Sequence, residues 1–215
     1  MQMPAAVALS QGVAAPAVLI IPAIFGVGPD NRARVQELAA SGHSAACVDP
    51  FWRVEPGVYP YTDVTGALIR ARRVDPQQLL QDLVDAVDSL RSEASCNGRV
   101  AVVGICFGGR AAWKLGTSGV ADAVIAWHGG GLGGELSRIP ECPIDLHFGA
   151  SDTMIPAEEI AAIQDALALH PHADVHVHAD ANHGFTHRDA PPRYQATANS
   201  AAETGLARVL GLLSA

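Results

Sequence analysis

A cysteine between two glycines is the residue of this sequence best suited to chemistry, in Gly104-Ile105-Cys106-Phe107-Gly108. This G-x-C-x-G pattern is typical of a nucleophile elbow, a sharp turn between a strand and a helix, with cysteine in place of the usual serine. The nucleophile of such a turn has a strained backbone, and glycines at 104 and 108 avoid collisions across it. A helix that begins here directs backbone N–H groups toward the sulfur, which favours a thiolate and a developing oxyanion. We therefore interpret Cys106 as a nucleophile; the alternative is a small apolar residue buried in a glycine-rich turn.

An aspartate and a histidine follow Cys106 in the order that a catalytic triad of this kind requires. Asp152 comes directly after a predicted strand that ends at Phe148, and His183 comes after the last predicted strand. A histidine could take the thiol proton, and an aspartate could orient the imidazole and stabilise its charged form. The thiolate would then attack a carbonyl to give an acyl-enzyme, which water would cleave. The alternatives are an ordinary turn aspartate and a surface-loop histidine.

The elements that must position these residues follow from hydrophobic patterning. Apolar runs of strand length alternate with stretches of helical period, which predicts an α/β fold with a mostly parallel sheet. Residues 50–75 are rich in proline and glycine and are predicted to be irregular, forming part of a pocket wall. The next helix should begin with Asp75 as N-cap, Pro76 at the first position and Gln78 closing a capping box. The predicted strands are 17–21, 44–48, 99–103, 123–127, 144–148 and 174–179, and the other predicted helices are 31–41, 107–115, 156–167 and 194–213.

Composition limits the classes of partner. The chain has 215 residues, of which 49% are hydrophobic, enough for one core, so one domain over 1–215 is expected. A net charge of −8 argues against nucleic acid and anionic membranes as partners. The apolar stretch Val13–Gly28 is interrupted by prolines and the start of the chain has no basic segment, so we expect no membrane span, no leader and a cytoplasmic protein. The four cysteines are far apart without a CxxC pair, and we expect them to be reduced.

Histidines near the last strand raise the question of a metal site. His176 and His178 alternate with apolar residues, as on the polar face of a strand, and two histidines on one face can bind a metal. The sequence has neither a zinc-type cysteine spacing nor an HExxH helix, and it has no Walker or dinucleotide-binding loop. We therefore expect no metal and no cofactor; a metal-binding protein that uses this strand is the third and weakest alternative for function.

Four segments together resemble the dienelactone hydrolase family, and the resemblance covers nearly the whole chain. They are PAIFGVG near the start, GICFGG at the elbow, GASD and NHGF. The resemblance implies a compact α/β-hydrolase fold, with helices on both faces of the sheet, and a triad of Cys106, Asp152 and His183. It also implies an oxyanion hole made by the backbone N–H groups of Ile24 and Phe107. Typical members open the lactone ring of dienelactone in chlorocatechol degradation.

Two positions depart from the family pattern. Ala23 stands where the family has a glutamate that pairs with the resting cysteine system. Without this carboxylate, Cys106 would stay paired with His183 as a more readily oxidised thiolate, or activation would follow another route. His187 stands where the family has an arginine for the substrate carboxylate. An arginine that precedes the long helix, Arg70 or Arg72, could bind this carboxylate instead; the alternative is a solvated charge cluster.

Further pocket residues are expected at the functional edge of the sheet. Trp127 and His128 end a predicted central strand there, with structural packing as the alternative. Phe185 and His187 follow His183 closely and are candidates for substrate contact.

The sequence thus predicts a thiol hydrolase for a small-molecule lactone or activated ester, as a monomer or small homo-oligomer. The alternatives are a general carboxylesterase or thioesterase with the same triad, and a thiol sensor or binding protein without turnover, which Ala23 favours.

Overall fold

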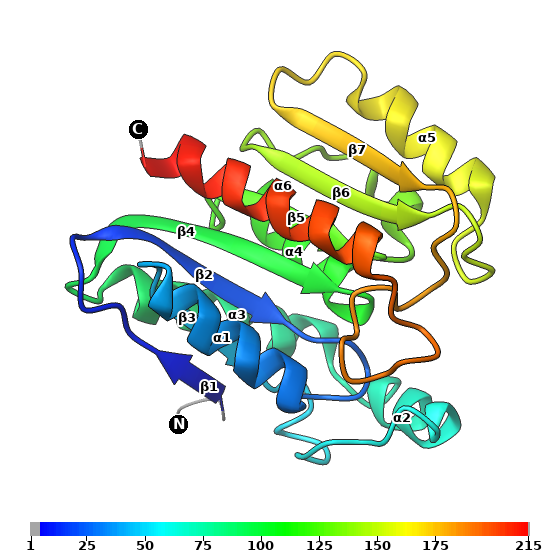
Figure 1. Cartoon of the computed structure of the whole chain (residues 1–215), viewed down its shortest axis with the longest axis horizontal. Coiled ribbons are helices and arrows are strands. Elements are labelled where there is room, and N and C mark those ends of the chain that lie inside the picture. Colours follow the sequence, from blue (N-terminus) through cyan, green and yellow to red (C-terminus); the bar gives the residue numbers. More distant parts are fainter. Residues whose placement is uncertain (1–4, 215) are drawn as a thin grey trace.

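Seven strands form one sheet in the computed structural model, which describes residues 5–214 (Figure 1). The strand order is β1-β3-β2-β4-β5-β6-β7; β1 is antiparallel to β3 and all other pairs are parallel. This confirms the predicted α/β fold with a mostly parallel sheet. The strands are β1 (Ala5–Ala8), β2 (Ala15–Ile21), β3 (Ala45–Val48), β4 (Cys96–Ile105), β5 (Ala123–Trp127), β6 (Ile144–Gly149) and β7 (Ala173–His178).

The central strands were predictable because both of their faces are covered. Every residue of β5 and β6 is buried, and parallel strands buried on both faces have apolar sequences without alternation. The observed bounds differ from the predicted ones by three residues or fewer at each end. β7 lies at the sheet edge and is less covered: its sequence alternates between polar and apolar residues, and the neighbouring residues His176 and Val177 are both exposed.

Helices cover both faces of the sheet, as expected. α1 and α6 lie on one face, and α3, α4 and α5 pack against the other (Figure 1). Val35 of α1 and Leu206 of α6 belong to one core cluster, whereas Leu83 of α3 and Ala112 of α4 belong to another. The helices are α1 (Pro29–Ala40), α2 (Val64–Ala71), α3 (Pro76–Arg91), α4 (Phe107–Thr117), α5 (Ala157–Leu167) and α6 (Ala196–Ser214), with a short 3-10 helix, η1 (Leu132–Glu135).

Three local features differ from the prediction. β1 was not predicted, and the segment 50–75 contains the eight-residue helix α2, because proline and glycine signals on both sides hid so short a helix. The Asp75 carboxylate does cap α3 by accepting from the backbone N–H groups of residues 77 and 78. The side chain of Gln78 does not close a capping box, because its amide donates to Asp82 instead (3.1 Å).

None of the helices between residues 5 and 214 is long and apolar enough to cross a membrane. The expected lack of a basic leader concerns a segment that begins with residues 1–4, which lie outside the described residues.

Candidate active site

Cys106 lies in the sharp turn between β4 and α4 and has a positive φ of 51°. Glycines allow this turn, because a Cβ on Gly104 would lie 2.3 Å from the carbonyl oxygen of Gly108. A Cβ on Gly108 would lie 2.2 Å from the carbonyl oxygen of Ile21. The backbone N–H of Cys106 donates to the carbonyl of Trp127 in the neighbouring strand (3.0 Å). The structure therefore has the predicted elbow, with the thiol side chain partly buried at the carboxyl end of β4.

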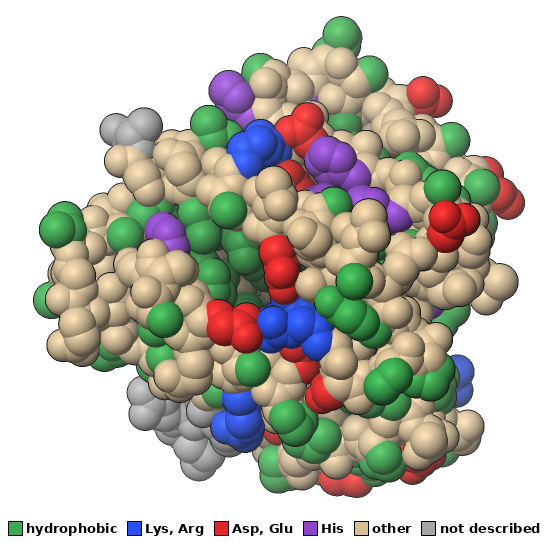
Figure 2. Space-filling model, viewed as in Figure 1, with side chains coloured by type: hydrophobic (Ala, Val, Ile, Leu, Met, Phe, Trp, Pro, Cys, Tyr) green, Lys and Arg blue, Asp and Glu red, His purple; other side chains and the backbone are tan. Residues whose placement is uncertain are grey.

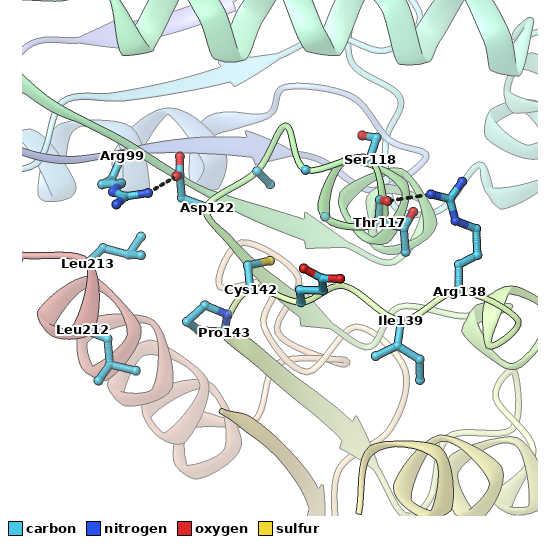
Figure 3. A pocket seen from close by; sticks show the side chains of 14 residues that line it. Arg99, Thr117, Ser118, Asp122, Arg138, Ile139, Cys142, Pro143, Leu212 and Leu213 are labelled. Carbon is cyan, nitrogen blue, oxygen red and sulfur yellow. Dashed lines mark hydrogen bonds and ion pairs between the residues drawn. The ribbon is translucent and has the colours of Figure 1, made fainter. Parts of the chain in front are cut away.

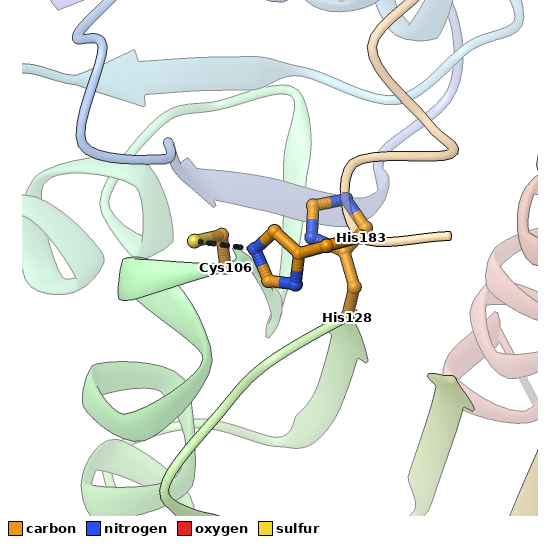
Figure 4. Close-up of side chains that lie close together, drawn as sticks. All are labelled: Cys106, His128 and His183. Atoms are coloured by element: carbon orange, nitrogen blue, oxygen red, sulfur yellow. Dashed lines mark hydrogen bonds between the residues drawn. The ribbon is translucent and has the colours of Figure 1, made fainter. Parts of the chain in front are cut away.

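His183 lies between Cys106 and Asp152. Its Nε2 is 3.1 Å from Cys106 Sγ (Figure 4), and its Nδ1 is 2.7 Å from Asp152 Oδ2. The other carboxylate oxygen of Asp152 accepts from the backbone N–H of Met154 (2.8 Å), which fixes the orientation of the carboxylate. The three residues follow β4, β6 and β7, whose carboxyl ends meet at one edge of the sheet. The structure thus brings together all three residues of the predicted triad.

His183 is electrostatically suited to hold a proton at neutral pH. Burial by itself disfavours the charged imidazole, but the hydrogen bonds to Asp152 and Cys106 outweigh it and raise the His183 pKa from 6.5 to about 9. An imidazolium next to the sulfur stabilises a thiolate, which is the nucleophilic form of cysteine.

The two predicted oxyanion-hole donors follow neighbouring strands of the sheet. Phe107 is the first residue of α4, where a backbone N–H has no acceptor within the helix, and Ile24 follows β2. β2 and β4 are paired, with Ile21 opposite Gly104. In residues 5–214, neither the Ile24 nor the Phe107 N–H group donates to another protein group.

A comparison with protein families identifies the chain. The model of the dienelactone hydrolase family matches residues 3–215. The chain belongs to the dienelactone hydrolase family. It is therefore a hydrolase with the α/β-hydrolase fold.

Curated relatives and solved structures agree. The sequence is 31% identical over 194 residues to carboxymethylenebutenolidase from Pseudomonas sp. (strain P51), covering 86% of this chain and 81% of that protein. It is 29% identical over 205 residues to carboxymethylenebutenolidase 1 from Cupriavidus pinatubonensis, covering 93% and 87%. A crystal structure of a dienelactone hydrolase from Klebsiella pneumoniae, described as putative, superposes with a TM-score of 0.84 at 22% identity, covering 97% of this chain and 92% of the other.

In this dienelactone hydrolase family member, Arg70 does not have the expected role in substrate binding. Its side chain is buried, and its guanidinium donates to the backbone carbonyls of Ile24 (2.7 Å), Gly57 (2.8 Å) and Glu55 (3.2 Å). The guanidinium also stacks on Phe51, 4.1 Å from the ring centroid. Arg70 therefore joins the segment after β3 to the carbonyl group of Ile24. The backbone N–H of the same residue is the predicted oxyanion donor.

Arg72 is exposed and lines a cavity of about 470 Å³ together with Phe107. Arg110 and Lys114 add positive charge, and Leu79 and Leu80 add apolar surface. A larger cavity, of about 790 Å³, lies at the opposite, amino end of β5 and β6, where Arg99, Asp122 and Arg138 are among its lining residues (Figure 3). Of these two cavities, only the first is next to the elbow.

The expected aromatic pocket residues pack behind the triad rather than forming an open wall. His128 is buried with a positive φ of 41°, and its ring contacts those of His183, Phe185 and His187 at centroid distances of 4.9–5.2 Å. Phe185 and His187 are buried as well. Trp127 is buried on the side of α1 and α6, where it lines a separate cavity of about 370 Å³. Trp127 and His128 are therefore both buried in the structure, and the cavity that Trp127 lines is not the one beside the elbow.

Arg34 was not identified from the sequence, although it supports the loop that follows His183. It is buried, and its guanidinium donates to the carbonyl of Thr186 (2.6 Å) and to the side chains of Asn199 (2.9 Å) and Glu203 (2.8 Å). It also pairs with Asp30 and lies over Trp127. Its pair with Asp30 is an ordinary i,i+4 helix pair, and the Thr186 and Asn199 partners that distinguish it from an exposed helix arginine are more than 150 residues away in sequence.

Proposed function

We propose that this protein is a thiol hydrolase that opens a small enol lactone of the dienelactone type through a thioester intermediate on Cys106. The observation that supports this most directly is the line of hydrogen bonds from Cys106 Sγ through His183 to Asp152, at 3.1 and 2.7 Å. The names of the relatives support the substrate class, since carboxymethylenebutenolidases act on such a lactone.

The proposed reaction has two steps. The Cys106 thiolate forms a bond to the lactone carbonyl carbon, and the carbonyl electron pair moves to the oxygen, which the N–H groups of Ile24 and Phe107 stabilise. The tetrahedral intermediate collapses, the ring C–O bond breaks, and the leaving enolate receives the proton of the His183 imidazolium. Neutral His183 then takes a proton from water, and the resulting hydroxide attacks the thioester carbon and releases Cys106.

The leaving group determines which substrates suit this nucleophile. A tetrahedral intermediate expels its better leaving group. An alkyl ester would have to expel an alkoxide and an amide would have to expel an amine anion, so both would mostly expel the thiolate and return to the starting substrate. An enolate or a thiolate leaves readily, and the proposed substrates are therefore enol lactones and activated esters, not amides.

The cavity beside Phe107 fits a substrate that carries a carboxylate. Its floor is apolar, and three cationic side chains line it. Arg110 and Lys114 both pair with Glu135, whereas Arg72 makes no ion pair within residues 5–214. We therefore assign the substrate carboxylate to Arg72, whose planar guanidinium can bind it with two hydrogen bonds.

The decisive experiment follows the loss of dienelactone ultraviolet absorbance with the wild type, Cys106→Ala and Cys96→Ala, and follows p-nitrophenyl acetate hydrolysis in parallel. Loss of dienelactone turnover in Cys106→Ala but not in Cys96→Ala, whose cysteine is only partly buried and lies at the opposite end of β4 from the elbow, is the expected result. Cysteine-dependent turnover of the acetate alone would favour the carboxylesterase alternative. Rapid alkylation of Cys106 without any turnover would favour the sensor.

A second pair of variants tests the pocket. Arg72→Ala should raise the KM for dienelactone about tenfold, by the loss of one charge-assisted contact, and leave p-nitrophenyl acetate hydrolysis unchanged. Arg73→Ala is the matched control, because Arg73 is exposed and pairs with Glu55 instead of lining the cavity. An unchanged KM in Arg72→Ala would refute the assignment of the carboxylate site.

A further inference from the structure

A second cluster of histidines lies under α6, and the pairing of β6 with β7 creates it. The register places His147 opposite His176 and Asp145 opposite Asp174. Residues 144, 146 and 148 face the core beneath α5, so Asp145 and His147 project to the other side of the sheet. Figure 2 shows histidines at this surface beside acidic and basic side chains, in the region between α6 and β7.

Three potential metal ligands converge in this cluster. One ligand atom each from Asp145, His147 and His176 lies within 4.8 Å of the others. Asp145 Oδ1 is hydrogen-bonded to His147 Nε2, and Asp145 Oδ2 is 3.9 Å from His176 Nε2. Asp145 and His147 are buried, and the His176 side chain is 45% exposed, so the group is buried on one side and open to water on the other.

The helix above the cluster has no side chain at the position that faces it. Gly205 of α6 faces the ligand atoms, and a Cβ at this position would lie 2.6 Å from Asp145 Oδ1 and 2.7 Å from His147 Nε2. The Cβ atom of any other residue at position 205 would collide with these two atoms, so either the two side chains or the helix would have to move.

His178 can orient His147 as a metal ligand. His178 Nε2 is 3.0 Å from His147 Nδ1, and the two ring planes are nearly parallel, with an interplanar angle of 8°. A metal-ligating histidine usually forms a hydrogen bond with its second ring nitrogen, which fixes its tautomer. With a metal on Nε2, His147 carries its proton on Nδ1 and donates it to His178.

We propose that Asp145, His147 and His176 form a binding site for a divalent transition-metal cation such as Zn²⁺. Two neutral imidazole nitrogens and one carboxylate oxygen are ligands that Zn²⁺ prefers, and water completes a tetrahedral set on the exposed side. Arg208 now pairs with Asp145 (2.8 Å) and also with Asp174. The guanidinium of Arg208 therefore keeps Asp174 as an ion-pair partner when the cation binds the Asp145 carboxylate. The ion would join the edge strand β7 to β6 and stabilise the fold without taking part in ester hydrolysis.

The test must separate this site from the candidate active site, because Cys106, His128 and His183 also lie close enough together to hold an ion. Cys106→Ala is therefore the parent. Untagged parent protein is dialysed to equilibrium against Zn²⁺ at pH 7.5, and bound zinc is measured by elemental analysis. We expect one zinc per chain. Co²⁺ should give d–d absorption bands in the wild type as well as in the parent, and the bands assigned to this site should lack sulfur-to-cobalt charge transfer.

Single variants in the parent then identify the ligands. His176→Ala should weaken zinc binding more than tenfold, and His178→Ala about 10- to 100-fold as the loss of an orienting group. His172→Ala should bind like the parent, because His172 is an exposed histidine that precedes the same strand. Circular dichroism establishes whether each variant is folded. We expect His176→Ala to fold, because the His176 side chain is exposed and its removal leaves no cavity in the core. A parent that binds no zinc, or a folded His176→Ala variant with unchanged affinity, would overturn the proposal.

Discussion

Replacing Asp152 by asparagine tests the central electrostatic argument without changing the size of the side chain. Asp152 accepts the Nδ1 proton of His183 and is the first of the groups that raise its pKa from 6.5 to about 9. Asparagine still fits between Met154 N and His183 but carries no charge. Burial, which lowers the His183 pKa, would then be opposed by Cys106 alone, and we expect the pKa to return toward 6.5.

The size of the effect follows from these two pKa values. At pH 7.5 a group with a pKa of about 9 is about 97% protonated, and a group with a pKa of 6.5 is about 9% protonated. The imidazolium that stabilises the Cys106 thiolate should therefore be about tenfold less populated at pH 7.5 in Asp152→Asn.

The assay is the rate of Cys106 alkylation by iodoacetamide as a function of pH, followed by mass spectrometry of the peptide that contains Cys106. We expect the alkylation rate at pH 7.5 to fall by up to about tenfold in Asp152→Asn, as the population of the His183 imidazolium falls. Asp180→Asn is the control, because Asp180 is exposed just before the same loop. An alkylation profile identical to that of the wild type would show that Asp152 does not control the charge of His183, and would refute the reasoning.

Three further predictions concern the scaffold. Arg34→Met removes a buried cation and leaves the Thr186 carbonyl and the Asn199 side-chain oxygen without their donor, whereas Asp30 keeps Arg188 as a partner, so urea denaturation should give a free energy of unfolding lower by about 2–5 kcal/mol; a loss below about 1 kcal/mol would contradict the role of Arg34. Gly108→Ala puts a Cβ against a backbone oxygen and should cost about 3 kcal/mol, whereas Gly134→Ala, with open space around it, should cost far less. Burial lowers the His187 pKa from 6.5 to about 3. Below pH 6.5 the imidazole of His187 is therefore protonated in the unfolded chain but stays neutral in the folded chain. Stability should therefore fall by about 1.4 kcal/mol per pH unit between pH 6 and 4 from this group, and a His187→Gln variant that is just as acid-sensitive as the wild type would refute this.

The sequence alone determined the fold class, the central strands and the triad order. Strands such as β5 and β6 are buried on both faces, so their apolar runs are visible without knowledge of their neighbours. The elbow was equally visible, because the turn at Cys106 needs glycines within two residues of it. Both features are local, and the carboxyl ends of parallel strands lie at one edge by topology.

The tertiary structure alone decided which polar side chains are buried, and against what. Arg70 and Arg72 are two residues apart, yet one is buried against the Ile24 carbonyl and the other is exposed in a cavity wall, because α2 turns them to different sides. Likewise, His147 meets His176 only through the register of β6 with β7, and Arg34 meets Thr186 only through packing of α1 against the last loop. Contacts of this kind depend on register and on the packing of distant segments, which the periodicity of a single segment does not encode.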